Sequence, residues 1–227
     1  MVLSTGVDVS ARRGLDIVTL DERRRFVGPP LRRQSLVDLR RLLKDVQPNV
    51  VAIDSPPYFC SSGRSRECER TLMRLGVQCY ATPSEAAGKK HFYDWMREGQ
   101  KVFRVAQDTG YELYLQGRSV RNRAIEIFPH ASAVVLRGKL PPYGWSKKRA
   151  LKKRWREEVL VSHGVDTEPL VSLDEVDAAL AALTGLLALE GVFLGIGDSC
   201  DGVIVLPINE VDGRFSRETG GVSPTSP

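Results

Sequence analysis

The sequence lacks several features that mark particular classes of protein. No apolar run approaches the roughly 20 residues that a helix needs to cross a bilayer, which argues against a membrane-spanning helix. The first residues have neither a basic start nor a long apolar stretch, so we expect no secretory signal and a cytoplasmic location. A glycine-rich phosphate loop is also missing, because Gly195-x-Gly197-Asp198 is too short and lies too late in the chain. Its absence argues against a nucleotide-dependent phosphotransferase.

Cysteine is scarce as well. The four cysteines show no C-x-x-C spacing, which argues against a zinc site, and a cytoplasmic location argues against disulfides, so we expect free thiols. The other residues give an ordinary globular composition, 42% hydrophobic and 27% charged. A length of 227 residues suits one α/β domain, which we place at residues 1–210. The tail at 217–227 is rich in small polar residues and proline, and we expect it to be disordered.

The net charge of +5 is mild evidence for a polyanionic partner. Basic proteins release counterions from nucleic acid when they bind it, and this release favours the complex. Nucleic acid, DNA or RNA, is therefore the expected partner. The sequence gives no indication of the oligomeric state.

The first part of the chain predicts the element order β-β-β-α-β. Apolar and alternating segments predict three strands joined by tight turns, and leucines at helical spacing then predict a helix that ends before Pro48. The short apolar run that follows predicts a buried fourth strand. These elements are expected at residues 2–9, 14–20, 25–28, 36–46 and 50–54.

The rest of the chain predicts further helices around this core. Ser172 and Glu175 form a capping box, which places the start of a helix with a broad apolar stripe. Two charged segments are expected to form a helix and a helical insertion over one edge of the core, and one late strand is expected to be peripheral. The remaining expected elements are a helix at 66–75, the insertion at 88–118, strands at 123–128 and 203–206, and a helix at 146–162.

Acidic residues lie where hydrophobic elements end. These residues are Asp8, Asp54, Glu126 and Asp177, and each stands among apolar residues. Burial of a charged side chain costs on the order of several kcal/mol unless the charge is paired or binds a metal. The predicted order places the first and fourth strands side by side, so Asp8 and Asp54 are expected to be neighbours. Shared ligation of a metal would explain why four such residues occur together.

The spacing of Asp174 and Asp177, at i and i+3, can place both carboxylates on one helix face. Hard Mg²⁺ or Mn²⁺ prefers oxygen ligands, and two such ions can drive phosphodiester hydrolysis. We therefore predict a two-metal site with Asp8, Asp54, Asp174 and Asp177 as ligands. Each residue also has a simpler explanation as a turn or helix-terminus residue. For Glu126 the sequence leaves three alternatives: a fourth metal ligand, a solvent-facing strand residue, or the partner of an arginine.

Basic residues offer a surface for phosphates. Lys147, Lys148 and Lys152 lie on the helix expected at 146–162, and Trp155 there is open between stacking on a base and packing in the core. Arg66 is expected to act as a phosphate clamp near Asp54. The simpler alternative for all of these cations is a solvated helix surface.

A set of short motifs resembles one known family. They are Gly6-Val7-Asp8, Ala52-Ile53-Asp54-Ser55-Pro56, Arg66-Glu67-Cys68-Glu69, Ile125-Glu126-Ile127-Phe128-Pro129-His130, Tyr143 with Ser146-Lys147, and Asp177-Ala178-Ala179-Leu180. Together they resemble the domain of unknown function 429 family over residues 5–206. The resemblance implies a ribonuclease H-like mixed sheet flanked by helices and a predicted nuclease activity. It places the acidic site on Asp8, Asp54, Glu126 and Asp177, and the pair Asp174 and Asp177 also resembles that of Holliday-junction resolvases.

The leading hypothesis is a Mg²⁺- or Mn²⁺-dependent nuclease. Asp8, Asp54 and Asp177 would be ligands, and Asp174 or Glu126 would supplement them. The first alternative is a nucleotide-dependent phosphotransferase of a related superfold, which also carries an aspartate on its first strand. The second alternative is a non-catalytic binding module in which the carboxylates bind no metal.

Overall fold

The computed structural model describes residues 1–61, 65–145, 148–198 and 200–218. The elements, in chain order, are β1 (Leu3–Ser10), β2 (Gly14–Asp21), β3 (Leu31–Gln34), α1 (Leu36–Val46), β4 (Val50–Asp54), α2 (Glu67–Arg74), the 3-10 turns η1 (Ala87–Lys89) and η2 (His91–Tyr93), α3 (Asp94–Asp108), β5 (Glu112–Leu113), β6 (Arg123–Glu126), α4 (Pro129–Arg137), α5 (Arg149–Ser162), α6 (Leu173–Leu189), β7 (Leu194–Asp198) and β8 (Gly202–Leu206).

The central sheet is mixed, and its first strands follow the β-β-β-α-β order. Its strand order is β3-β2-β1-β4-β6-β8-β7, and β5 pairs separately with β6. β1, β2 and β3 are antiparallel neighbours, whereas β4 is parallel to β1 and β6 is parallel to β4. The expected β-β-β-α-β order and the mixed sheet are therefore confirmed.

Local sequence explains the crossover from β3 to β4. Ser35 caps α1 in a capping box with Asp38, and Gln47 ends the helix in the left-handed conformation. Leu39 and Leu43 form the buried stripe of α1, and every residue of β4 before Asp54 is buried. A buried parallel strand of this kind requires cover on both faces, and the helices provide it.

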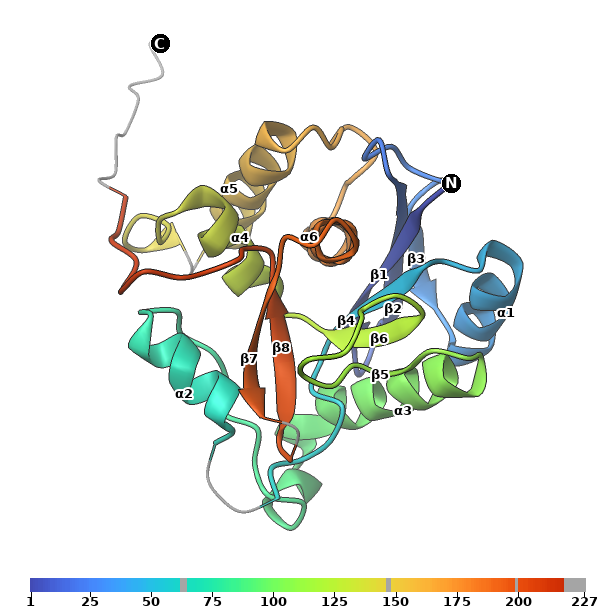
Figure 1. Cartoon of the computed structure of the whole chain (residues 1–227), viewed down its shortest axis with the longest axis horizontal. Coiled ribbons are helices and arrows are strands. Elements are labelled where there is room, and N and C mark those ends of the chain that lie inside the picture. Colours follow the sequence, from blue (N-terminus) through green and yellow to red (C-terminus); the bar gives the residue numbers. More distant parts are fainter. Residues whose placement is uncertain (62–64, 146–147, 199, 219–227) are drawn as a thin grey trace.

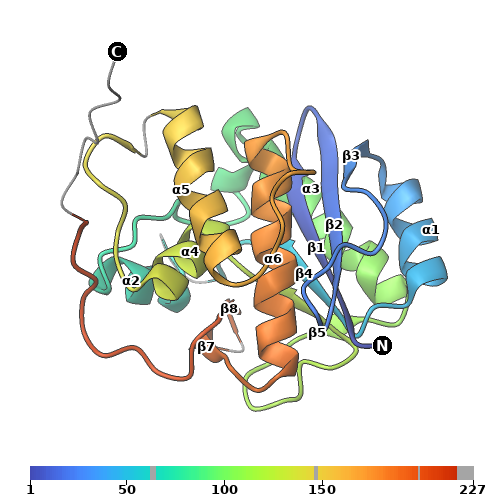
Figure 2. The ribbon, with the colours of Figure 1, turned by 90° about the horizontal axis from the view of Figure 1, so that it is seen from above.

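The two faces of the sheet carry different helices (Figure 1). α1 and α3 cover one face, where Val102 and Phe103 of α3 pack in one apolar cluster with Val7 and Ile53 of the sheet. α6 lies across the other face and contacts β1, β2 and β4. α5 lies beside α6 on this second face (Figure 2). On this second face, α6 is therefore the helix that packs directly against β1, β2 and β4.

Small residues allow α6 to lie directly on the sheet. A Cβ at Gly6 of β1 would lie 2.1 Å from the carbonyl oxygen of Ala178 and 2.4 Å from the backbone nitrogen of Ala182. A Cβ at Gly185 of α6 would lie 2.2 Å from the Oγ of Ser4. Only glycine fits at either contact, so these residues fix the helix close to β1. The same contact brings the acidic start of α6 near the end of β1.

The third strand differs from its prediction. It lies at Leu31–Gln34, whereas residues 25–28 form only a single bridge between Phe26 and Leu20. The Asp21 carboxylate accepts backbone N–H groups from Arg23 at 2.9 Å and Arg25 at 2.8 Å. The local turn thus uses the N–H of Arg25, a donor that a strand at 25–28 would require.

Three later predictions are also corrected. The segment at 88–118 is not an insertion over an edge, because α3 packs on the face of the sheet and supplies part of its core. β8 is not peripheral, because it lies between β6 and β7 and all of its residues are buried. Pro129 does not simply stop a strand: it occupies the first turn of α4, where a proline lacks no needed donor.

The described part of the tail is attached to the body. Arg217 forms a bridge with Leu140, and the Glu218 carboxylate accepts the indole N–H of Trp155 at 3.1 Å. The expectation of disorder is therefore corrected for these two residues, while 219–227 lie outside the described residues. The four cysteines are free thiols, as predicted. In the described part of the chain, none of the helices is both long enough and apolar enough to cross a membrane.

Candidate metal and nucleic-acid site

Three carboxylates form a row across three neighbouring strands. Asp8 of β1 is paired in register with Asp16 of β2 on one side and with Asp54 of β4 on the other. Residues in register on adjacent strands project from the same face of a sheet. The expected proximity of Asp8 and Asp54 is therefore present, and Asp16 joins them.

The first turns of α6 bring two further carboxylates to this row. Asp174 and Asp177 both influence the ionisation of Asp8, and carboxylate oxygens of Asp8, Asp16 and Asp174 all lie within 4.8 Å of one another. We call the five residues the carboxylate cluster: Asp8, Asp16, Asp54, Asp174 and Asp177.

Asp16 is the member of the cluster that sequence reasoning missed. It alternates with Leu15 and Ile17 in β2, so a solvent-facing position was a sufficient explanation. The available signal was the hairpin register, since the short turn at 11–13 places Asp16 opposite Asp8. Its carboxylate accepts the backbone N–H of Arg33 at 2.9 Å, which holds it in place.

Burial and mutual repulsion disfavour the charged form of the cluster. Burial raises the pKa of Asp8 well above its ordinary value of 3.8, and the carboxylates of Asp54, Asp177, Asp174 and Asp16 raise it further. Burial and then Asp177 likewise raise the pKa of Asp54, against the opposing effect of Arg156. A bound cation would relieve this repulsion.

Arginines already pair with the two carboxylates of α6. The buried guanidinium of Arg156 donates to Asp177, and Asp174 pairs with Arg13 at 2.6 Å and with Arg149 at 2.7 Å. Arg156 and Arg149 come from α5, which explains why α5 lies beside α6. These pairs offset part of the negative charge on one side of the cluster.

The residues fit one divalent ion better than two. Mg²⁺ holds oxygen ligands at about 2.0–2.1 Å, so two ligands of one ion lie at most about 4.2 Å apart. The oxygens of Asp8, Asp16 and Asp174, within 4.8 Å of one another, approach this geometry and need only small side-chain rotations. An ion held by Asp174 would compete with Arg13 and Arg149 for that carboxylate. An ion between Asp8, Asp54 and Asp177 would compete with the buried Arg156 guanidinium for Asp177.

Glu126 and Arg66 lie elsewhere and bind each other. The guanidinium of Arg66 donates to the two carboxylate oxygens of Glu126 at 2.6 and 2.7 Å and to Glu69 at 2.9 Å. The side chains of Arg66 and Glu126 are only 2% and 3% exposed. Glu126 is thus the partner of an arginine, not a free ligand, and Arg66 is not a surface clamp for phosphates. Pairing with an arginine was one of the alternatives left open for Glu126. The identity of that arginine was not predicted, because Arg66 and Glu126 are 60 residues apart in sequence and meet only in the fold.

The predicted basic helix contributes cations beside the cluster. Lys152 is half-buried; burial and Arg156 lower its pKa, while Asp177 and Asp54 raise it. Among the described residues it forms no ion pair within 4.0 Å, so its ammonium is available to a phosphate. Lys148 is exposed at the start of α5, and Lys147 lies outside the described residues. Trp155 packs in the core at 1% exposure and cannot stack on a base.

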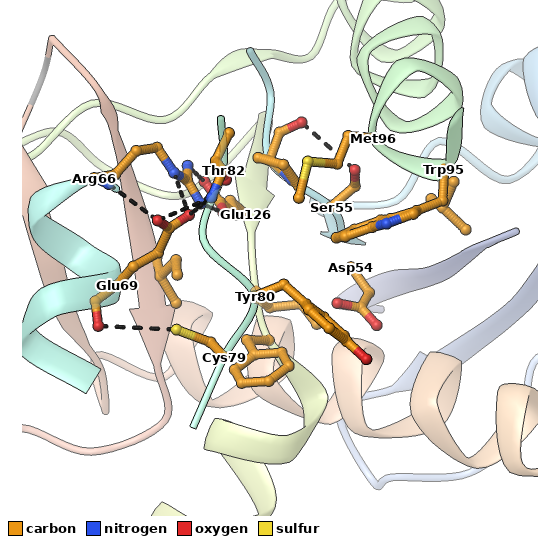
Figure 3. Close-up of a pocket in the computed structure, with 15 residues that line it drawn as sticks. Asp54, Ser55, Arg66, Glu69, Cys79, Tyr80, Thr82, Trp95, Met96 and Glu126 are labelled. Carbon is orange, nitrogen blue, oxygen red and sulfur yellow. Dashed lines mark hydrogen bonds and ion pairs between the residues drawn. The ribbon is translucent and has the colours of Figure 1, made fainter. Parts of the chain in front are cut away.

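Two cavities adjoin the cluster. One, of about 230 Å³, is lined by Asp54 and by the aromatic side chains of Tyr80, Trp95 and Phe128 (Figure 3). The second, of about 350 Å³, is lined by Lys152 and Arg156, and Tyr80 and Phe128 line both. The two cavities therefore form adjacent parts of one depression next to the carboxylates.

The raised pKa of Asp8 predicts an effect on stability when metal is removed. A carboxyl whose pKa is raised on folding stabilises the protein fully below about pH 3.8, and this contribution is lost as the pH rises through the folded-state value. Asp8→Asn, which stays neutral, is therefore expected to raise the Tm of the metal-free protein at pH 7. At this chain length each kcal/mol corresponds to about 2–4 °C, and the gain is expected to vanish near pH 4.

Thermal unfolding in a chelator across this pH range measures the effect. Asp45→Asn is the matched control, because Asp45 is exposed on α1, and it is expected to change the Tm little at either pH. A lower Tm for Asp8→Asn than for the wild type at pH 7 would show that the Asp8 charge is favourably paired.

Comparisons with known proteins place the chain in a family. No curated protein matches the sequence. Among solved structures, the chain is similar to that of RuvC from Thermus thermophilus, with 14% sequence identity and a TM-score of 0.43, over 83% of this chain and 96% of the other. The family described as "Protein of unknown function (DUF429)" matches residues 6–198. The match spans most of the chain, and the protein therefore belongs to the DUF429 family.

Proposed function

We propose that this protein is a Mg²⁺- or Mn²⁺-dependent nuclease that hydrolyses phosphodiester bonds. The observation that carries the proposal is the convergence of five carboxylates from β1, β2, β4 and α6. Burial and mutual repulsion destabilise the charged form of Asp8 in this cluster. Charged groups that are destabilised in a cleft are typical of functional sites. Oxygen-only ligands of this kind suit hard divalent ions.

Each residue of the cluster has a distinct role in this proposal. Asp8, Asp16 and Asp174 would hold the ion, and the chemistry it would supply there is activation of a water and stabilisation of the leaving oxygen of the phosphodiester. Asp54 faces the adjoining cavity and has a raised pKa, so it is suited to accept the proton of the attacking water. Arg156 holds Asp177 beside them.

We expect a second ion in the site only when substrate is bound. A second ion would require Asp177 to exchange its Arg156 partner for the metal, and the phosphate of a bound strand offers that guanidinium another anion. Without a strand, one ion is the expected occupancy.

Lys152, Lys148, Arg13 and Arg149 form the proposed surface for the phosphate backbone. Arg13, on the turn between β1 and β2, and Arg149, on α5, both pair with Asp174 of the cluster. Lys152 lies on α5, and Lys148 immediately precedes this helix. Affinity that depends on such cations falls with salt, because each phosphate contact releases condensed counterions.

Lys152→Met is expected to weaken binding to a single-stranded oligonucleotide and to reduce the slope of log affinity against log salt by about 0.7. The reason is that Lys152 is unpaired among the described residues and lines the depression beside the cluster. Fluorescence anisotropy with Ca²⁺ present, at several salt concentrations, measures the slope. Lys44→Met is the control, since exposed Lys44 lies on α1 at the opposite face of the sheet. Equal slopes for the two variants would remove Lys152 from the binding surface.

One observation favours a second candidate, a non-catalytic binding module. The ion pairs of Asp174 and Asp177 with arginines offset charge without any metal. A module of this kind would bind nucleic acid equally well with a divalent ion and with a chelator.

A cleavage assay separates the two candidates. The protein is incubated with labelled single-stranded and duplex DNA and RNA, with Mn²⁺, with Mg²⁺ or with a chelator. Metal-dependent cleavage that is absent in the chelator supports the nuclease. If the protein binds nucleic acid but cleaves none of these substrates under any of the conditions, the result would contradict the nuclease and favour the non-catalytic binding module.

A further inference from the structure

The cavity at Asp54 has a shape and lining that the proposed hydrolysis does not itself require. It is bounded by Val9, Met96, Ile127 and Ile204 together with three aromatic side chains, and its volume is about 230 Å³. Drug-sized ligands and cofactors occupy pockets of about 300–1,000 Å³. This cavity can hold one planar ring system but not a base, a sugar and several phosphates together.

Aromatic side chains stand at the end of this cavity that faces the carboxylates. Figure 3 shows Tyr80 and Trp95 at the Asp54 end, with Arg66, Glu69 and Glu126 at the other. Tyr80 is 67% exposed, and its ring meets that of Phe92 edge to face with centroids 5.7 Å apart. Phe92 in turn packs edge to face on Tyr93 at 4.9 Å. The contact with Phe92, which itself packs on Tyr93, restricts the Tyr80 ring while leaving it exposed to a ligand.

The polar groups at the far end are already bonded to one another. Both carboxylate oxygens of Glu126 accept from Arg66, and Glu69 accepts from Arg66 and from the backbone and hydroxyl of Thr82. None of these atoms needs a ligand to satisfy it. A ring in the cavity would therefore be bound by stacking and apolar contact, with little reading of its hydrogen-bonding edge.

From this juxtaposition we infer that the cavity accepts one unpaired nucleobase of a strand whose phosphate lies at the carboxylate cluster. The inference rests on the proposed function and narrows its substrate class to nucleic acid with an unstacked base next to the cleaved bond. Stacking on aromatic side chains tolerates any base, because every base has a π-face. The protein is thus expected to act on single strands, flaps or mismatches with weak base preference, and to act poorly on perfect duplex.

A strand is favoured over a free nucleotide for two reasons. The cavity is too small for a whole nucleotide, so the sugar and phosphate must remain outside it. The adjoining cavity, which Lys152 lines, shares Tyr80 and Phe128 with this one, so a half-buried ammonium lies beyond the two rings for a neighbouring phosphate of the same strand.

The test uses a single-stranded oligonucleotide with one 2-aminopurine, whose fluorescence is quenched when the base stacks. Ca²⁺ replaces Mn²⁺, so binding is measured apart from cleavage. The wild type is expected to quench the probe, and Tyr80→Leu is expected to lose about tenfold to a hundredfold in affinity and most of the quenching. Tyr80→Phe keeps the ring and is expected to stay close to the wild type. Tyr143→Leu is the control, since Tyr143 is 85% exposed and does not line the cavity.

The outcomes separate this inference from the nuclease. Cleavage in Mn²⁺ with unchanged binding in Tyr80→Leu would overturn the base pocket and leave the nuclease standing. Tyr80-dependent quenching without cleavage would support the pocket and contradict the nuclease. Adenosine monophosphate that binds as tightly as the oligonucleotide, or an oligonucleotide that does not bind at all, would overturn the inference.

Discussion

Asp8→Asn is expected to reduce the rate of metal-dependent cleavage by at least about 100-fold, because loss of a direct ligand costs more than loss of a supporting hydrogen bond, which itself costs about 10–100-fold. Asp8 is the residue for this test because it lies in register with both Asp16 and Asp54. Asp8 therefore belongs to both possible sets of metal ligands, one with Asp16 and Asp174 and the other with Asp54 and Asp177. Asparagine keeps the shape of the side chain and removes its charge.

The initial rate on a labelled single strand in Mn²⁺ measures this effect. Asp45→Asn removes one carboxylate from an exposed position on α1 and is expected to keep the wild-type rate. The Tm of metal-free Asp8→Asn, which is expected to exceed that of the wild type, shows whether the variant is folded. An Asp8→Asn protein that cleaves at most of the wild-type rate would contradict the proposed role of the cluster.

Arg66→Met is expected to destabilise the protein by about 3–5 kcal/mol, because it leaves two buried carboxylates without their cation. Arg66 binds Glu126 through both of its terminal nitrogens and Glu69 through Nε, and all three side chains are nearly inaccessible to water. At this chain length the expected fall in Tm is about 6–20 °C. Arg66→Lys is expected to recover little, since an ammonium cannot replace the planar, forked guanidinium.

The same helix provides the control. Arg70 of α2 pairs with Glu67 at 2.9 Å, but these side chains are 50% and 36% exposed. Exposed pairs contribute about 0–1 kcal/mol, so Arg70→Met is expected to change stability little. Urea unfolding of both variants measures the difference. If Arg66→Met were as stable as Arg70→Met, the buried network would not be an important stabilising feature of the fold.

Local patterns in the sequence were sufficient to predict the β-β-β-α-β order, apart from the position of the third strand. The leucine spacing and capping of α1 and the apolar run of β4 depend on neighbouring residues only, and both elements lie where they were expected. The capping box at Ser172 likewise marks the true start of α6. From these elements the proximity of Asp8 and Asp54 follows by the right-handed crossover rule.

Features that depend on distant contacts were not predictable in this way. The charged segment at 88–118 reads as peripheral, yet α3 buries one stripe against β1 and β4 and exposes the other. Asp16 reads as a solvent-facing strand residue until the hairpin register is known. For Glu126 an arginine partner was one of several alternatives, and the sequence gives no sign that Arg66, 60 positions away, is that partner.

The most direct test of the account is a calorimetric titration of Mn²⁺ into the wild type and into Asp8→Asn, repeated with an oligonucleotide present. We expect saturable binding to the wild type, with one ion per chain in the absence of the strand, and loss of that binding in Asp8→Asn. The absence of saturable binding to the wild type, even with the oligonucleotide, would contradict a metal site at the carboxylate cluster.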